Sequence, residues 1–130
     1  MLLDTHFVLW LLVGSPQLKK YPWLADRRPW SISPVSLLEI QFLHEIGRLR
    51  VDRSALAEAL AVDPRFVIDD ISLSVLIDSA MTVEWTRDPF DRLLVAHSLA
   101  RRLEFCSADR LIRTQHRLLP APLRPKPKER

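Results

Sequence analysis

The 130-residue sequence contains one cysteine, two glycines and no long apolar run. Cys106 has no possible partner within the chain, which excludes an internal disulfide and suits a reducing cytoplasm. Gly14 and Gly47 stand far apart, so no glycine-rich loop can cradle a phosphate. No apolar stretch is long enough to span a bilayer, and the N-terminus lacks the basic region of a signal peptide. We therefore expect no membrane association.

The side chains that often bind soft metals also lack a recognisable pattern. The four histidines show no spacing such as HExxH, so structural or solvent-facing roles are expected for His6, His44, His97 and His116. Cys106 follows apolar residues and is expected to be an inert core thiol. The formal net charge of +3 permits an anionic partner without demanding one.

The length of the chain suits one domain with a sizeable core. We expect this domain to occupy residues 1–119. Residues 120–130 form a proline-rich basic tail that cannot be regular helix and should be extended and solvated, with contact to a partner or to RNA as the alternative. Its charges come from Arg124, Lys126, Lys128 and Arg130.

Short apolar runs alternate with helical patterns along the chain. Strands are predicted at 2–3, 30–33, 66–68 and 104–106, and helices at 6–13, 35–49, 54–61, 73–81, 90–103 and 111–116, with a short helix in the proline-broken stretch 17–29. The helix at 35–49 has an apolar stripe formed by Leu38, Phe42, Leu43 and Ile46. This alternation predicts an α/β fold in which parallel strands are covered by helices on both faces.

Four acidic residues follow strand ends or begin helices: Asp4, Glu39, Asp91 and Asp109. Ligands of such sheets bind outside the carboxyl ends of the strands, so all four side chains could face one edge. Carboxylate oxygens are the ligands that Mg²⁺ and Mn²⁺ prefer. Together the four residues suggest a divalent-metal site of a nuclease.

Each carboxylate also has a simpler explanation. Ser36 and Glu39 fit a helix capping box, Asp88 could cap a helix whose first turn contains Asp91, and Asp109 could cap the last helix. Asp4 is the least easily explained, because it interrupts an apolar segment where an unpaired carboxylate is costly.

A second acidic pair, Asp69 and Asp70, also follows a predicted strand and could suggest a phospho-acceptor receiver domain. A receiver resembles an acidic pair after its first strand combined with a lysine late in the fold, whereas Lys19 and Lys20 come early here. A turn or cap role is therefore expected for this pair. The four tryptophans are most simply core or interface residues.

The segments LLDTH, ISPVSLLEI, RDPFDRLLVAHSLA and CSADRLI, in this order, resemble the PIN-domain family. They look most like the VapC toxins of bacterial and archaeal toxin–antitoxin pairs. The resemblance extends from Leu2 to about Leu119. It implies a PIN-like α/β/α sandwich with a short, mostly parallel central sheet.

The resemblance also implies roles for individual residues. The family's acidic quartet corresponds to Asp4, Glu39, Asp91 and Asp109, which would hold one or two Mg²⁺ or Mn²⁺ ions. Thr5 and Ser107 stand where the family often has a supporting hydroxyl, although threonine is more common at the second position. Three arginines flank the acidic motifs and could meet phosphates or serve as surface charges: Arg87, Arg92 and Arg110.

The function implied is metal-dependent endoribonuclease activity that leaves 5′-phosphate and 3′-hydroxyl ends. A cognate antitoxin would block the site, often by placing an arginine or lysine among the carboxylates, and a homodimer or larger toxin–antitoxin assembly is expected. Two alternatives stay open: a catalytically weak PIN-like scaffold that binds nucleic acid, and a nuclease that acts on DNA.

Overall fold

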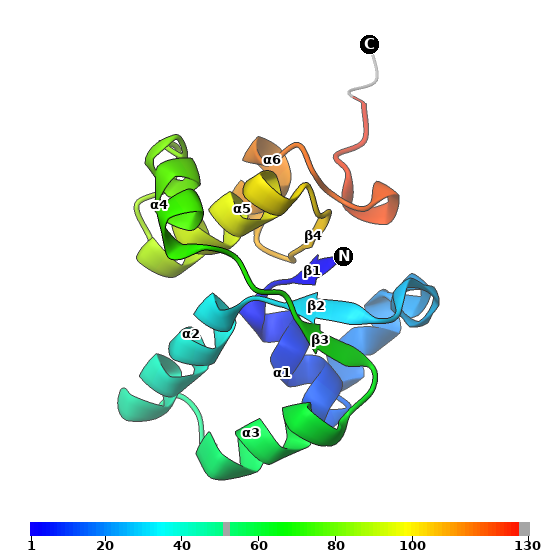
Figure 1. Cartoon of the computed structure of the whole chain (residues 1–130). Coiled ribbons are helices and arrows are strands. Elements are labelled where there is room, and N and C mark those ends of the chain that lie inside the picture. Colours follow the sequence, from blue (N-terminus) through cyan, green and yellow to red (C-terminus); the bar gives the residue numbers. More distant parts are fainter. Residues whose placement is uncertain (51–52, 128–130) are drawn as a thin grey trace.

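Four short strands form one parallel sheet in the computed structural model, which describes residues 1–50 and 53–127 (Figure 1). The strands are β1 (Leu2–Leu3), β2 (Trp30–Ile32), β3 (Phe66–Ile68) and β4 (Phe105–Cys106). Their spatial order is β3-β2-β1-β4. Because every strand runs in the same direction, all four carboxyl ends meet at one edge. The predicted α/β fold with a parallel sheet is confirmed.

Helices cover both faces of this sheet. Figure 1 shows α1 (Thr5–Val13), α2 (Pro34–Glu45) and α3 (Arg53–Val62) on one face and α4 (Leu73–Met81), α5 (Pro89–Arg101) and α6 (Arg110–Gln115) on the other. The proline-broken stretch forms two short 3₁₀ helices, η1 (Pro16–Lys20) and η2 (Pro22–Arg27), where a single short helix was expected. Within the described ranges, no helix has the length and apolar character required to cross a membrane.

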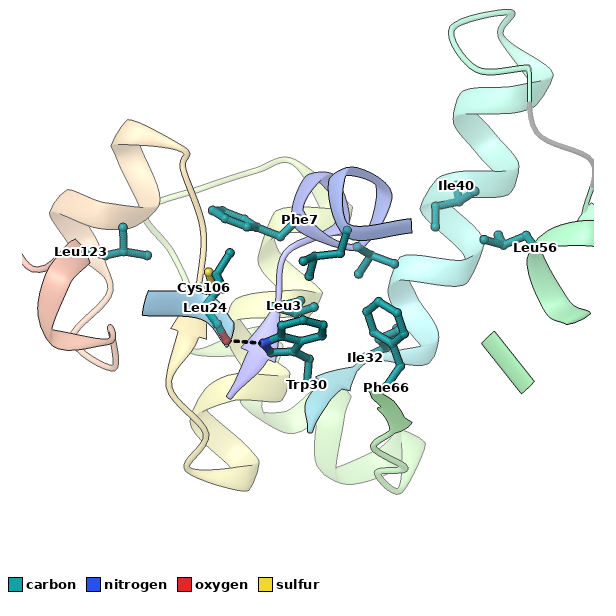
Figure 2. Packing of buried hydrophobic residues seen from close by; sticks show 12 residues of the cluster. Leu3, Phe7, Leu24, Trp30, Ile32, Ile40, Leu56, Phe66, Cys106 and Leu123 are labelled. Carbon is teal, nitrogen blue, oxygen red and sulfur yellow. Dashed lines mark hydrogen bonds between the residues drawn. The ribbon is translucent and has the colours of Figure 1, made fainter. Parts of the chain in front are cut away.

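Adjacent strand residues point to opposite faces of the sheet and so build two separate cores. Leu2 and Phe105 pack with α4, α5 and α6. Leu3 and Cys106 pack on the opposite face with α1, α2 and α3, where the indole of Trp30 donates a hydrogen bond to the Leu24 carbonyl (3.0 Å; Figure 2). Burial raises the pKa of the Cys106 thiol, so the expectation of an inert core thiol is confirmed.

Polar side chains fix where the helices begin. Asp4, Asp88 and Asp109 are the N-caps of α1, α5 and α6, as the sequence suggested for the last two. Helix α2 begins differently: Ser33 is its cap and accepts from the Val35 N–H (3.2 Å). The capping-box interpretation of Ser36 and Glu39 is therefore wrong, because both residues lie inside the helix.

The first residues of the proline-rich C-terminal segment pack against the domain. Ala121–Leu123 forms a 3₁₀ helix, η3, and Leu123 is only 3% exposed within the core beside α1. The expectation of an extended, solvated segment is wrong for these residues, because a leucine between prolines can still bury its side chain against the domain. Residues 124–127 are exposed, and residues 128–130 of the expected tail lie outside the described residues. The division between domain and tail stays a prediction.

Candidate active site

A cavity of about 640 Å³ lies at the carboxyl edge of the sheet, beyond β1 and β4. All four carboxylates selected from the sequence line it: Asp4, Glu39, Asp91 and Asp109. They come from four separate segments, namely the end of β1, the second turn of α2, the first turn of α5 and the start of α6. The fold therefore gathers side chains that lie up to 105 residues apart in the chain, counted from position 4 to position 109.

Asp4 is the most buried member of this group, with 6% of its surface exposed. Its backbone N–H donates to the Cys106 carbonyl (2.9 Å), which fixes it at the end of β1. Its carboxylate accepts from the Thr5 N–H (2.7 Å) and from the Ser107 hydroxyl (2.7 Å). Burial nevertheless raises the pKa of Asp4, and these two hydrogen bonds only partly oppose that effect.

The two supporting hydroxyls are both buried beside Asp4. Ser107 donates to Asp4 and accepts from the Asp109 N–H (3.1 Å), so it joins two members of the acidic group. Thr5 donates to the Ser36 hydroxyl (3.0 Å), which ties the start of α1 to α2. Each hydroxyl therefore holds backbone or side chains of the site in place.

Asp91 shows the effect of gathering like charges. Its pKa is raised to about 7, first because its side chain is partly buried and then because Asp4, Asp88, Asp109 and Glu39 surround it. Burial also raises the pKa of Glu39, and the nearby charge of Asp4 acts in the same direction. Near neutral pH the cavity is thus a strongly negative site in which one carboxylate is close to half-protonated.

The structure does not bring the three flanking arginines to this cavity. Arg87 is exposed and does not line it. Arg92 donates to the Ala80 carbonyl (2.8 Å) and so joins α5 to α4. Arg110 lines a separate cavity of about 370 Å³ near Pro125. Their contact with a substrate stays a prediction.

Comparison with known families agrees with this arrangement. The model of the PIN domain family matches residues 1–115 of the 130. The chain belongs to the PIN-domain family. PIN domains are generally nucleases, often acting on RNA. No curated protein and no solved structure gives a significant match.

Several residues of this PIN-domain cavity were missed by the sequence analysis. Two basic side chains, His6 and Arg48, line it together with an apolar wall that includes Phe42 and Phe90. Helical spacing could have found Phe42, which lies three residues after Glu39 and so on the same side of α2. Arg48 gave no local signal, because it lies in the turn after α2 and only the tertiary fold brings that turn to the carboxylates.

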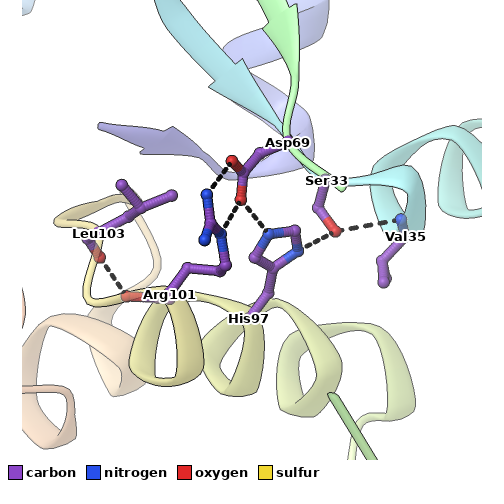
Figure 3. Close-up of polar contacts among 7 residues, drawn as sticks. Ser33, Val35, Asp69, His97, Arg101 and Leu103 are labelled. Carbon is purple, nitrogen blue, oxygen red and sulfur yellow. Dashed lines mark hydrogen bonds and ion pairs between the residues drawn. The ribbon is translucent and has the colours of Figure 1, made fainter. Parts of the chain in front are cut away.

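A second polar cluster lies at the same edge of the sheet, beyond β2 and β3. Figure 3 shows His97 of α5 between Asp69 and Ser33, at 2.8 Å and 2.7 Å, while Arg101 adds two hydrogen bonds to Asp69 (3.0 and 3.1 Å). His97 is fully buried. The structural role expected for this histidine is confirmed, whereas Asp69 does more than form a turn, because it joins β3 to α5.

The donor set of the cavity fits a hard, hydrated cation. Among residues 1–50 and 53–127, no three His, Cys, Asp or Glu side chains are placed to hold a metal ion by themselves. Mg²⁺ usually keeps several of its waters and needs only one or two direct carboxylates, so a wider ring of acidic groups suits it. The repulsion among these carboxylates, which adds to the effect of burial on the pKa of Asp91, would be relieved by a cation at this position.

Proposed function

We propose that this PIN domain is a Mg²⁺-dependent endoribonuclease and the toxin of a type II, VapBC-like toxin–antitoxin system. One observation carries the proposal: four carboxylates from distant segments line one cavity, where burial and the neighbouring acidic groups raise the pKa of Asp91 to about 7. Perturbed carboxylates in a cavity at the carboxyl edge of a parallel sheet are typical of a reaction centre. The PIN-domain membership of the chain supports the same reaction class.

The residues that would hold Mg²⁺, or Mn²⁺ in its place, are Asp4, Glu39, Asp91 and Asp109. When bound, one or two such ions would supply an activated water and charge stabilisation for the leaving 3′-oxygen. Cleavage would leave 5′-phosphate and 3′-hydroxyl ends.

The chain's own side chains would orient the groups that take part in the reaction. Asp4 is locked by the Thr5 N–H and the Ser107 hydroxyl, so its two oxygens keep a fixed direction without reorganisation. Asp91 lines the same cavity from the first turn of α5, so it would supply a further carboxylate towards the ion.

The toxin role adds a cognate antitoxin and a homodimer or larger assembly, acting in the cytoplasm. Exposed apolar side chains outside the acidic cavity support a need for protein partners. These are Leu38 on α2 and Leu73, Ile77 and Met81 on α4. The antitoxin would block the cavity by placing a basic side chain among the carboxylates.

The first experiment incubates the purified protein with total RNA in Mg²⁺ or in EDTA, beside an Asp4→Asn variant. Discrete fragments with 5′-phosphates are expected only for the wild type in Mg²⁺, because Asp4 lies at the centre of the acidic group. Asp78→Asn is a matched control, since this exposed carboxylate on α4 lies outside the cavity. Intact RNA from folded, partner-free wild type would contradict the proposal. Cleavage of DNA or binding without cleavage would favour the alternative nuclease or scaffold.

A further inference from the structure

The cavity that contains the carboxylates also has an aromatic wall. Phe42 is 43% exposed, although it is a large apolar side chain, and both Phe42 and Phe90 line the cavity. Their ring centroids lie 5.5 Å apart with the planes tilted by 37°. An apolar aromatic surface left open to water beside a charged site is unfavourable unless something covers it.

The sequence positions of the two rings place them beside the acidic group. Phe42 follows Glu39 by three residues on α2, so the two side chains share one side of that helix. Phe90 immediately precedes Asp91 in the first turn of α5. The aromatic pair therefore bridges the two helices that carry Glu39 and Asp91, and whatever occupies the acidic centre lies next to these rings.

The cavity is larger than a hydrated ion and a phosphate require. Its volume of about 640 Å³ falls within the range of pockets that enclose a whole small molecule. Arg48 also lines it, and no ion pair or side-chain hydrogen bond joins Arg48 to the described part of the chain. The groups in this cavity match the parts of a nucleotide. The carboxylates match a metal-bound phosphate, the guanidinium of Arg48 matches a neighbouring phosphate, and the aromatic face matches a base.

We infer that the Phe42–Phe90 pair is a stacking platform for one unpaired base next to the scissile phosphate, with Arg48 contacting an adjacent phosphate. The inference rests on the proposed ribonuclease function. Bases of single strands stack on exposed aromatic side chains, whereas paired bases are already stacked on their neighbours and cannot reach a recessed ring. The platform therefore selects RNA whose base is unpaired at the cut site.

A protein side chain is the other possible cover for the rings, and position argues against it. Leu38 lies one turn before Phe42 and is 61% exposed, but it lines a different cavity shared with α4. Phe42 instead faces the cavity of the carboxylates. The apolar stripe of α2 is thus divided, with Leu38 outside the reaction centre and Phe42 at its wall.

The test uses an eight-nucleotide single-stranded RNA centred on a cut site mapped in the total-RNA digest, and the same RNA annealed to its complement. Cleavage rates give kcat and KM for the full-length wild type, Phe42→Leu, Phe42→Trp, Arg48→Ala and Leu38→Ala. Leucine keeps the apolar volume without a ring face, and tryptophan restores one. An abasic residue on either side of the scissile phosphate removes the candidate base.

Phe42→Leu is expected to raise KM about tenfold for the single strand, with kcat changed less than about threefold, and Phe42→Trp to restore wild-type KM. Arg48→Ala should raise KM severalfold, Leu38→Ala should not change it, and the duplex should resist cleavage. An abasic residue on one side should raise the wild-type KM similarly and have little further effect in Phe42→Leu, because both changes remove the same contact.

Three results would overturn the platform while leaving the ribonuclease function intact. The first is an unchanged KM in Phe42→Leu, and the second is a rise in the KM of Leu38→Ala equal to that of Phe42→Leu. The third is a change in the oligomeric mass of Phe42→Leu without a change in its KM, which would mark the ring as part of a protein interface. Absence of Mg²⁺-dependent cleavage by the wild type, for any RNA, would overturn the proposed function itself.

Discussion

Two polar clusters lie along the same edge of the sheet, and they treat charge in opposite ways. Beyond β2 and β3, Asp69 is paired with His97 and Arg101, and these partners lower its pKa (Figure 3). Beyond β1, Asp91 is partly buried beside other acidic groups, and its pKa rises to about 7. The first cluster is satisfied within the protein, whereas the second is left with excess negative charge that a bound cation would neutralise.

The contrast separates a structural from a functional use of carboxylates. A buried polar network in which every group has a partner stabilises one arrangement of the chain. A group of like charges destabilises the folded state, and a protein retains such a group when it binds a ligand. Stability is then lower in exchange for activity. We therefore expect substitutions in the two clusters to have opposite consequences.

The largest difference is expected for Asp91→Asn. RNA cleavage should fall at least about 100-fold, because loss of a carboxylate from the proposed metal site exceeds the usual effect of losing a supporting contact. The free energy of unfolding at pH 8 in EDTA should rise by about 1 kcal/mol, after allowance for solvent screening of a half-buried group. Cleavage assays and urea unfolding measure both quantities. A variant that stays active, or becomes less stable, would contradict the functional assignment.

Substitution in the paired cluster should have the reverse effect. Asp69→Ala leaves the buried ring of His97 without its carboxylate partner and should lower the free energy of unfolding by about 1–3 kcal/mol. Cleavage well below the unfolding temperature should change less than about threefold. Asp70→Ala is the control, because the neighbouring carboxylate is exposed. Equal urea midpoints for the two variants would show that the network adds nothing to stability.

The smallest expected effect is the pH dependence of stability in EDTA. The pKa of Asp91 is raised above its value of 3.8 in the unfolded chain, so its stabilising contribution is complete below about pH 4 and is lost as the pH rises towards 7. Asp69 behaves oppositely, because its lowered pKa gives stability that is present above about pH 4 and lost in acid. The free energy of unfolding from urea titrations should fall by about 1 kcal/mol between pH 5 and 8 in the wild type and change less in Asp91→Asn. An identical slope in both proteins would exclude Asp91 as its source.

Metal should remove this pH dependence. A bound Mg²⁺ favours the ionised form of the surrounding carboxylates, so its addition should raise stability most at high pH. The Asp91→Asn variant should respond less to Mg²⁺ than the wild type.

Helix starts illustrate the limits of local patterns. Asp88 and Asp109 were recognisable as caps, because an acidic residue before a helical pattern has a local hydrogen-bonding partner. Ser36 fits the same pattern but lies within α2, since Ser33 and Pro34 begin the helix one turn earlier. The capping role of Asp109 is compatible with the proposed role in the cavity, because Asp109 accepts from the Ile112 N–H and also lines the cavity.

The sequence by itself determined the alternation of strands and helices and the residues that end each strand in a polar group: Asp4, Ser33, Asp69 and Ser107. Local hydrophobic periodicity and turn chemistry are enough for that. Only the tertiary structure decided which polar groups acquired partners, that Phe42 lines the acidic cavity whereas Leu38 lies outside it, and that Arg48 reaches this cavity in place of Arg92. These outcomes depend on the order β3-β2-β1-β4 and on how α2 and α5 pack beside it, and contacts between distant segments leave no periodic signal in a single chain.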